Sequence, residues 1–437
     1  MMANSSVSTV ETLVESFERG RGALPGPGLA ATRGSAIAAF AREGFPTPRL
    51  ESWKYTNLNR LSRAAFDPLA DVAPVTASDW ADLRIDGADV VVVANGRYDA
   101  AASSVGALPA GTVLAPLSLA IDGVEKDLAN EEPGAAGSLV ALNTAFMRDG
   151  LVLRLPKGAV LNRPVQVLHI VDGGATGLSV HPRTVIEAGE GAEATVIETF
   201  AGAGEAATWT NAVTEIRVGA NARIRHYKRQ SETEAAYHTA VSRVRLDRDA
   251  HYEAVALATG AALSRNEIRV SFEGSGADAE LRGGALLRGR QHADNTTEAD
   301  HRVPHTSSRQ VFRNVLDGRS RSVFQGGVIV EKDAQKTDSS QSNRNLLLSA
   351  GAQADTKPEL RIFADDVKCA HGATVGDLDR TALFYLNSRG IPPDEAKALL
   401  ICAFVGEIVE TIGEEAVKAH FDAAIAGWMA GLGGEKG

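Results

Sequence analysis

The sequence repeats one short phrase four times: Glu-Gly-Ala-Glu-Ala at 190–194, Gly-Ala-Asn-Ala-Arg at 219–223, Arg-Asp-Ala-His-Tyr at 248–252 and Gly-Ala-Asp-Ala-Glu at 276–280. The alanines at equivalent places in the phrase, Ala192, Ala222, Ala250 and Ala277, are 30, 28 and 27 residues apart. Between the phrases, polar and apolar residues alternate with a period of two, as at 215–218 and 243–246. This alternation is typical of short β-strands.

A spacing that stays so constant is typical of a solenoid, in which each coil packs on its neighbours. Strands joined by small turns indicate a β-solenoid rather than a helical one. Glycine supplies positive φ at the corners, and alanine fits a narrow interior. A β-sandwich with regularly spaced turns is the alternative that the period alone leaves open.

Helical patterns flank the β region on both sides. Near the N-terminus, apolar residues recur at helical spacing ahead of Gly20, and a second helix is expected at 35–43. Toward the C-terminus we expect a helix at 381–388, a longer one that begins after Pro392, and a last one. We therefore predict an N-terminal helical domain at 1–85, a β-helix core at 86–378 and a C-terminal helical domain at 379–437. Such helical domains would cap the open ends of a solenoid.

The helix after Pro392 is expected to turn one apolar side inward. That side is predicted to comprise Leu399, Leu400, Ala403, Phe404, Ile408 and Ile412. Cys402 lies in the same apolar run and is expected to be a small core residue rather than a ligand.

The composition is that of an ordinary globular protein. Of its 437 residues, 44% are apolar and 23% are charged, which excludes wholesale disorder because a large core can be buried. The net charge of −10 argues against non-specific binding to nucleic acid or anionic membranes, since both select clustered Lys and Arg. Two cysteines, Cys369 and Cys402, exclude a disulfide framework and a four-thiolate zinc site within one chain.

Targeting signals are not evident in the sequence. The start of the chain lacks a basic segment followed by an apolar stretch. The longest apolar run, at 398–405, has eight residues, whereas a bilayer span needs about 20. We therefore expect a soluble protein of the cytoplasm.

The clearest chemical feature is the pair Cys369 and His371 in Val-Lys-Cys-Ala-His-Gly at 367–372. In a strand, residues two apart point to the same face, so the thiol and the imidazole would stand side by side. Both are good ligands for iron, copper or zinc, but any metal would need further ligands from a partner chain. A buried cysteine beside a hydrogen-bonded histidine is the structural alternative. A nucleophile–base pair is disfavoured, because such pairs normally come from separated segments.

Three other features of the sequence are candidate sites. His301 and His305 are four residues apart, but Pro304 favours an extended segment over a metal pair on a helix. The polar stretch 335–345 is expected to be either a surface loop or a set of amide and hydroxyl ladders at a solenoid corner. A phosphate-binding P-loop motif is absent from the sequence, so the chain should not bind ATP through one.

An ordered series of short motifs covers about a quarter of the chain. It comprises Gln-Lys-Thr-Asp at 335–338, Asn-Leu-Leu-Leu-Ser at 345–349, Lys-Pro-Glu-Leu at 357–360, the stretch 364–376 around Cys369, Phe-Tyr-Leu at 384–386 and Ser-Arg-Gly-Ile at 388–391. In this order the motifs resemble the SufB/SufD family of iron–sulfur cluster assembly proteins. Phe-Pro-Thr-Pro-Arg at 45–49 and Glu-Ser-Trp-Lys-Tyr-Thr at 51–56 are similar to the SufD branch.

The resemblance implies a right-handed parallel β-helix flanked by helical domains, without enzyme activity of its own. It implies a scaffold subunit that pairs with SufB through the β-helix and docks the ATPase SufC through the C-terminal helical domain. A nascent iron–sulfur cluster or iron would be shared transiently with SufB, with no tightly bound cofactor in the isolated chain. The resemblance leaves open which type of cluster is built, whether a flavin binds to the complex and whether the isolated chain forms a homodimer.

The resemblance also implies roles for particular residues. By position, His371 is the candidate ligand for the cluster or iron, facing a cysteine supplied by SufB, and Cys369 is a second candidate. SufC docking is expected at Leu383, Phe384, Tyr385 and Arg389. The alternative is that these groups only cap the β-helix. Trp53 and Tyr55 are expected to pack the N-terminal domain.

The sequence disfavours two other functions. A β-helix carbohydrate-active enzyme would usually carry a secretory signal and aromatic residues that stack on sugars, and aromatic residues are only 5% of this chain. A SufB-type paralogue with a cysteine-rich scaffold role is disfavoured because the chain has only two cysteines.

Overall fold

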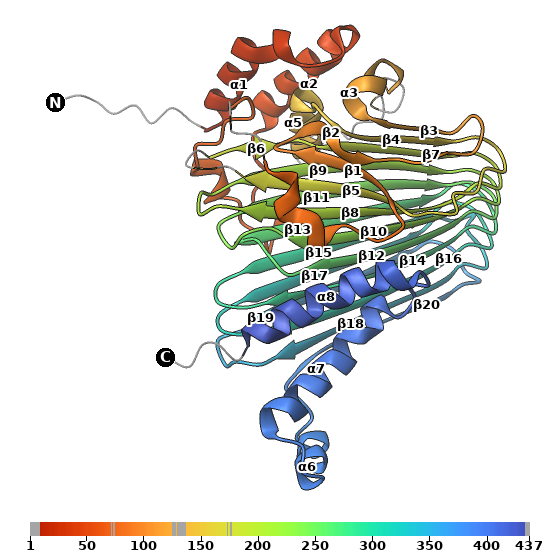
Figure 1. Ribbon diagram of the computed structural model, residues 1–437. Helices are drawn as coiled ribbons and strands as arrows, with labels where there is room; N and C mark the ends of the chain where they lie inside the picture. The colour runs from red at the N-terminus through yellow and green to blue at the C-terminus, as the bar shows by residue number, and fades with distance from the viewer. Residues whose placement is uncertain are drawn as a thin grey trace.

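The structure is a computed structural model that describes residues 9–432, apart from 71, 73–74, 125–127, 129–136, 173 and 175–176. Within these residues, two long and mainly parallel sheets face each other, and the chain coils from one sheet to the other and back (Figure 1). Helices lie at the beginning and the end of the coiled region. The predicted β-solenoid is confirmed, and the β-sandwich alternative is wrong.

Each coil contributes one strand to each sheet. The first sheet runs in the order β2 (Arg97–Ser104), β1 (Asp89–Ala94), β5 (Val165–Asp172), β8 (Glu193–Ala203), β10 (Arg223–Ser231), β12 (His251–Ala258), β14 (Asp278–Leu287), β16 (Ser307–Leu316), β18 (Asp338–Leu347) and β20 (Lys368–Gly376). The second runs in the order β19 (Gln353–Ile362), β17 (Arg321–Val330), β15 (His292–His301), β13 (Leu263–Phe272), β11 (Tyr237–Leu246), β9 (Trp209–Val218), β7 (Arg183–Ala188), β4 (Gly150–Leu155) and β3 (Val113–Pro116), with β6 (Ser179–Val180) beside β9. The pairs β1–β2 and β3–β4 are antiparallel.

One corner of the solenoid is a column of residues with positive φ. Gly191, Asn221, Asp249 and Gly276 have φ between 55° and 79°, and each precedes one of the repeated alanines. Their backbone N–H groups donate to the coil above, as from Asn221 to the carbonyl of residue 248 at 2.9 Å. Asn and Asp replace glycine at two corners because their short polar side chains tolerate the left-handed conformation. The four alanines are at most 1% exposed, so their predicted place in the interior is confirmed.

The interior changes character along each coil. Next to the column of alanines it is apolar, with Val196 and Ile224 among its buried residues. Farther along the same strands it is polar, and the buried carboxylate of Glu198 lies 2.7 Å from Nε2 of His226. Many of these polar groups are hydrogen-bonded to one another, which offsets the cost of burying them.

The polar stretch 335–345 forms part of this interior. Oγ of Ser339 on β18 lies 2.8 Å from Oγ of Ser308 on β16, and Nδ2 of Asn314 donates to Oδ1 of Asn345 at 2.8 Å. The ladder alternative is therefore correct from residue 338 onward, but the ladders lie on the inner faces of strands rather than at a corner. The surface-loop alternative is wrong for these residues.

Apart from α6 (Arg380–Ser388), which projects away from the sheets, the helices pack on the outside of the solenoid (Figure 1). They are α1 (Thr9–Gly20), α2 (Ala30–Glu43), α3 (Leu117–Ala120), α5 (Ser138–Phe146), α7 (Pro393–Val409) and α8 (Glu415–Gly431). Phe17 of α1 and Phe40 of α2 share an apolar cluster with Phe146 and Trp209. None of the described helices is both long and apolar enough to cross a bilayer.

The C-terminal helices do not cap the open end of the solenoid, contrary to expectation. Helices α7 and α8 lie across the outer face of the first sheet (Figure 1). Ile408 and Phe421 pack there with Tyr227 and Leu286 of the sheet. The outward residues of these strands are themselves apolar, so burying them against helices is more favourable than exposing them.

The predicted inward side of α7 is only partly correct: Ile408 and Ile412 are buried and Phe404 packs against the same cluster, but Ala403 is exposed. Ile401, Val405 and Ile408 are buried, whereas Leu399 and Cys402 are exposed. The run from 398 to 409 is apolar on nearly every side, so helical spacing alone could not identify the face that meets the sheet.

Four buried histidines link the fold to pH. Burial is the main cause that lowers the pKa of His169 and His301 to about 4, and of His181 and His420 to about 3. An unfolded histidine has a pKa near 6.5, so between pH ~6.5 and ~4 the unfolded chain binds more protons than the folded one. Stability contributed by the neutral histidines is therefore lost as pH falls through this window.

We predict that His181→Gln removes about 2 kcal/mol of the stability loss between pH 7.5 and pH 5.0, because glutamine does not titrate. Urea unfolding of both proteins, followed by circular dichroism at the two pH values, measures this difference. An unchanged pH dependence in the variant would contradict the prediction.

Candidate functional site

The solenoid ends in two open strand edges. In the described part of the chain, β20 is the last strand of the first sheet and β19 the last of the second (Figure 1). An open edge presents unpaired backbone N–H and C=O groups, which favours pairing with another chain. Large apolar side chains are exposed on or directly after these strands: Ile362, Phe363 and Val375.

Cys369 and His371 both lie on β20 at this end. In the parallel register, Cys369 pairs with Ser339 and His371 pairs with Gln341. The two side chains are on the same face of the strand because they are two residues apart. Cys369 is half-buried against the apolar interior, whereas His371 is exposed. Another molecule can therefore reach His371.

The environment of Cys369 keeps its thiol protonated. Burial raises the pKa of Cys369, and the carboxylate of Asp338 raises it further, while a backbone hydrogen bond at Ser339 acts in the opposite direction. A raised pKa is the reverse of what an activated cysteine nucleophile needs. Binding of a metal would have to displace the proton.

The described residues offer two ligands at this place. No three His, Cys, Asp or Glu side chains within the described ranges come together to hold a metal ion. A closed site with four ligands would need donors from elsewhere.

The other histidine candidates are structural. The ring of His301 is buried and stacks on Phe272, with a centroid separation of 4.1 Å. Its ring nitrogens lie 2.8 and 2.9 Å from the hydroxyls of Thr306 and Ser308. His305 has φ of 59° in the corner column. The two histidines therefore do not form a metal-binding pair, which agrees with the extended segment predicted from Pro304.

Helix α6 begins at a capped N-terminus and projects away from the sheets (Figure 1). The Asp379 side chain accepts hydrogen bonds from the backbone N–H groups of Thr381 and Ala382 at 2.8 and 3.2 Å. Such a cap stabilises a short helix by about 1 kcal/mol. The helix ends before Gly390, which has φ of 87°. The prediction of a helix at 381–388 is confirmed.

The four predicted docking residues lie on or next to this helix. Phe384 and Tyr385 are 75% and 56% exposed, Arg389 is exposed, and Leu383 is half-buried. The guanidinium of Arg389 lies 5.1 Å from the centre of the Tyr385 ring. Helix α6 has no buried residue. The alternative that Phe384 and Tyr385 cap the β-helix is therefore wrong.

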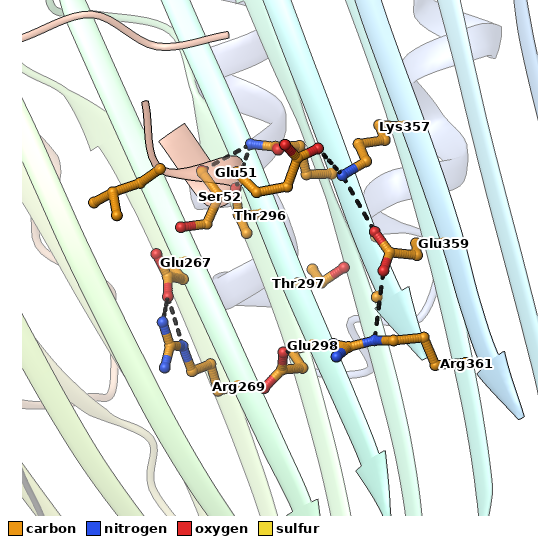
Figure 2. A pocket seen from close by; sticks show the side chains of 14 residues that line it. Glu51, Ser52, Glu267, Arg269, Thr296, Thr297, Glu298, Lys357, Glu359 and Arg361 are labelled. Atoms are coloured by element: carbon orange, nitrogen blue, oxygen red, sulfur yellow. Dashed lines mark hydrogen bonds and ion pairs between the residues drawn. The ribbon is translucent and has the colours of Figure 1, made fainter. Parts of the chain in front are cut away.

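A pocket of about 350 Å³ on the outer face of the second sheet was not predicted (Figure 2). We call it the outer pocket. It is lined by Leu50, Glu51, Ser52, Glu267, Arg269, Thr296, Thr297, Glu298, Gln325, Gly326, Gly327, Lys357, Glu359 and Arg361. Two sequence motifs quoted above, at 51–56 and 357–360, meet here. The two motifs are visible in the sequence, but nothing in the sequence shows that they are neighbours in the fold, so the pocket could not be predicted from them.

The motif at 51–56 attaches the N-terminal region to the last coils. The Trp53 ring is buried under the guanidinium of Arg265, 4.0 Å from the ring centre, and Nε2 of Gln325 donates to the carbonyl of Ser52 at 3.0 Å. Trp53 is therefore a packing residue, as expected, and this packing forms one wall of the outer pocket.

Comparison with known proteins agrees with the fold. The sequence profile described as SUF system FeS cluster assembly, SufBD core domain, matches residues 169–404, and the SufBD protein N-terminal region matches 23–167. The iron-sulfur cluster assembly protein SufD of Escherichia coli is 31% identical over 396 residues, which cover 89% of this chain and 90% of that protein. A SufBD family protein of Synechocystis is 30% identical over 84% of each chain, and SufD of Bacillus subtilis is 30% identical over 66% of each.

These matches define the class of protein as a β-solenoid of the SUF iron–sulfur cluster assembly system. The chain belongs to the SufBD family, and the E. coli and B. subtilis relatives named above are SufD proteins. The family membership rules against the carbohydrate-active enzyme. It also places Cys369, His371 and α6 inside the matched core region.

The raised pKa of Cys369 leads to a prediction about its reactivity. In a Cys402→Ser background, Asp338→Asn should speed alkylation of Cys369 by iodoacetamide at pH 7.5 about twofold, because removing the nearby negative charge increases the thiolate fraction. Mass spectrometry of quenched samples measures the rate. Asp394→Asn on α7 is the control for a change of net charge, and equal rates in the two variants would contradict the assignment.

Proposed function

We propose that this chain is a non-catalytic scaffold subunit for iron–sulfur cluster assembly, and that it supplies part of a site completed by a second subunit. The observation that carries the proposal is the exposed imidazole of His371 beside the Cys369 thiol on the last strand of the solenoid. Family membership gives the chemical context, because the SufD relatives are iron-sulfur cluster assembly proteins.

The partner at this end is proposed to be SufB, joined through the β-helix. The open edges of β19 and β20 offer backbone groups for pairing, and exposed side chains such as Phe363 and Val375 offer apolar contact. A partner that covers this end brings its own side chains to His371. A thiolate supplied by the partner would add the third soft donor that the described residues lack.

The nascent cluster, or iron, is the cargo of this site rather than a resident cofactor. His371 binds as a neutral imidazole, and Cys369 binds after the incoming metal displaces its proton. A site divided between two chains can be opened or closed when one chain moves relative to the other. Release of the cargo then needs no chemistry by this chain.

The ATPase SufC is proposed to dock on α6. An exposed aromatic pair on a projecting helix fits the mode in which a helix enters a groove of its partner. Phe384 and Tyr385 would be the anchors, and Arg389 would add a charged contact at the edge. Hydrolysis of ATP by SufC is the proposed source of movement between the subunits.

The cytoplasm remains the proposed compartment, since free cysteines suit a reducing environment.

The ligand role of His371 is tested by His371→Ala in the assembled complex. We expect iron retained on the complex to fall about tenfold or more, while the folding of the chain and its binding to SufC stay unchanged. Cluster formation followed by visible absorption and iron analysis measures the effect. Lys368→Ala, on the opposite face of the same strand, is the control. Normal cluster formation in the His371 variant would remove the ligand role.

The docking role of α6 is tested by the double substitution Phe384→Ser and Tyr385→Ser. Loss of two aromatic anchors should weaken SufC binding by roughly 30-fold or more in calorimetric titration. Leu119→Ser, at another exposed apolar residue on α3, should leave the affinity unchanged. Equal affinities for the two variants would show that SufC binds elsewhere.

A further inference from the structure

The outer pocket is hollow because a strand residue that faces outward lacks a side chain. In the register of the second sheet, Gly327 on β17 lies between Glu298 on β15 and Glu359 on β19. A Cβ atom on Gly327 would meet the carbonyl oxygen of Thr297 at 3.5 Å and Cγ of Glu298 at 3.9 Å, which are ordinary contacts. Packing therefore does not require glycine at 327. Its effect is to leave open space between two carboxylates.

The neighbouring glycine has a different role. A Cβ atom on Gly326 would lie 2.6 Å from Cζ of Phe324 and 2.9 Å from Nε2 of Gln341, both in the interior. Gly326 is thus required by the packing of the solenoid, whereas Gly327 shapes the outer pocket. The two positions can be changed independently in an experiment.

The charged side chains that line the outer pocket do not balance. Four carboxylates, from Glu51, Glu267, Glu298 and Glu359, face three cationic groups, from Arg269, Lys357 and Arg361. Figure 2 shows Glu298 between the Glu267–Arg269 pair and the Glu359–Arg361 pair. Among the residues that line the pocket, carboxylates therefore outnumber cations by one; Glu267 is also paired with Arg265 outside the lining, at 3.0 Å, and Arg265 in turn pairs with Asp294.

The surplus is concentrated at Glu298. Lys357 is shared between Glu51 at 2.6 Å and Glu359 at 3.2 Å, and Arg361 is shared between Glu359 at 3.4 Å and Glu298 at 3.5 Å. Three carboxylates thus share two cations. Burial raises the pKa of Glu298 despite the attraction of Arg269 and Arg361, which agrees with an incompletely compensated carboxylate.

We propose that the outer pocket binds a cationic group, an alkylammonium or guanidinium on an aliphatic stem, between Glu298 and Glu359 above Gly327. The added positive charge would supply the missing partner of the three carboxylates, and charged hydrogen bonds of this kind are the strong ones. Leu50 on the pocket wall offers apolar contact for the stem. The volume of about 350 Å³ lies within the range of small-molecule sites.

The same chemistry has two sources: a free polyamine, or a lysine or arginine side chain of another protein. Agmatine represents the first and the peptide acetyl-Gly-Arg-Gly-amide represents the second. Calorimetric titration of the full chain with each probe should show saturable binding that weakens as salt is added. Tighter binding of agmatine would indicate a free polyamine, and tighter binding of the peptide would indicate a protein side chain.

Two variants test the location of the site. Glu298→Gln removes the charge, and Gly327→Val fills the space, so each should weaken binding of the better probe about tenfold or more. Glu187→Gln is the matched control, because Glu187 is an acid of the same sheet that is paired with Arg154 at 2.6 Å, outside the pocket. Circular dichroism checks that each variant is folded.

The outcomes separate this inference from the assembly role. Absence of saturable binding by both probes, or equal affinities in Glu298→Gln and Glu187→Gln, would overturn the cation site. Neither result would bear on His371, because the outer pocket lies on the outer face of the second sheet and His371 lies on a strand of the first.

Discussion

The in-register parallel ladder between coils is the constraint on which the rest of the structure depends. Each corner residue with positive φ donates its N–H to the coil above, and each strand residue inherits the face and depth of the residue below it. Gln310, Gln341 and His371 occupy one such row, and Ser308, Ser339 and Cys369 occupy another. The two candidate ligands continue rows of inward residues, and they become accessible because no described strand follows β20.

The ladder also explains why the interior can be polar. A polar side chain on one coil has a neighbour at a fixed separation on the next, so a hydrogen bond at one level can be repeated, as between Asn314 and Asn345. Charged groups are tolerated for the same reason. Burial by itself would raise the pKa of Glu198, but the hydrogen bond and the charge of His226 lower it well below its usual range. Such networks are costly if incomplete, and they favour a single register of the coils.

The two faces of the solenoid have different roles because their outward residues differ. The first sheet carries an apolar cluster on its outside that α7 and α8 cover, with arginines such as Arg282 and Arg313 bound to Glu407 of α7, and α6 is left free to project. The second sheet carries alternating charges on its outside in the last coils, and the N-terminal segment around Trp53 packs beside them. The helices therefore occupy the sides of the solenoid, while its end remains available to a partner.

The spacing of Ala192, Ala222, Ala250 and Ala277 predicted a β-solenoid from the sequence, because a repeat of constant length can close the same coil many times, although it left a β-sandwich open. The sequence also determined the helix at 381–388 and the adjacency of Cys369 and His371, because both depend on local periodicity. The buried side of α7, the exposure of Cys402 and the meeting of Glu51 with Lys357 in the outer pocket are known only from the three-dimensional fold. These features depend on surfaces brought together from distant parts of the chain, and local spacing carries no information about them.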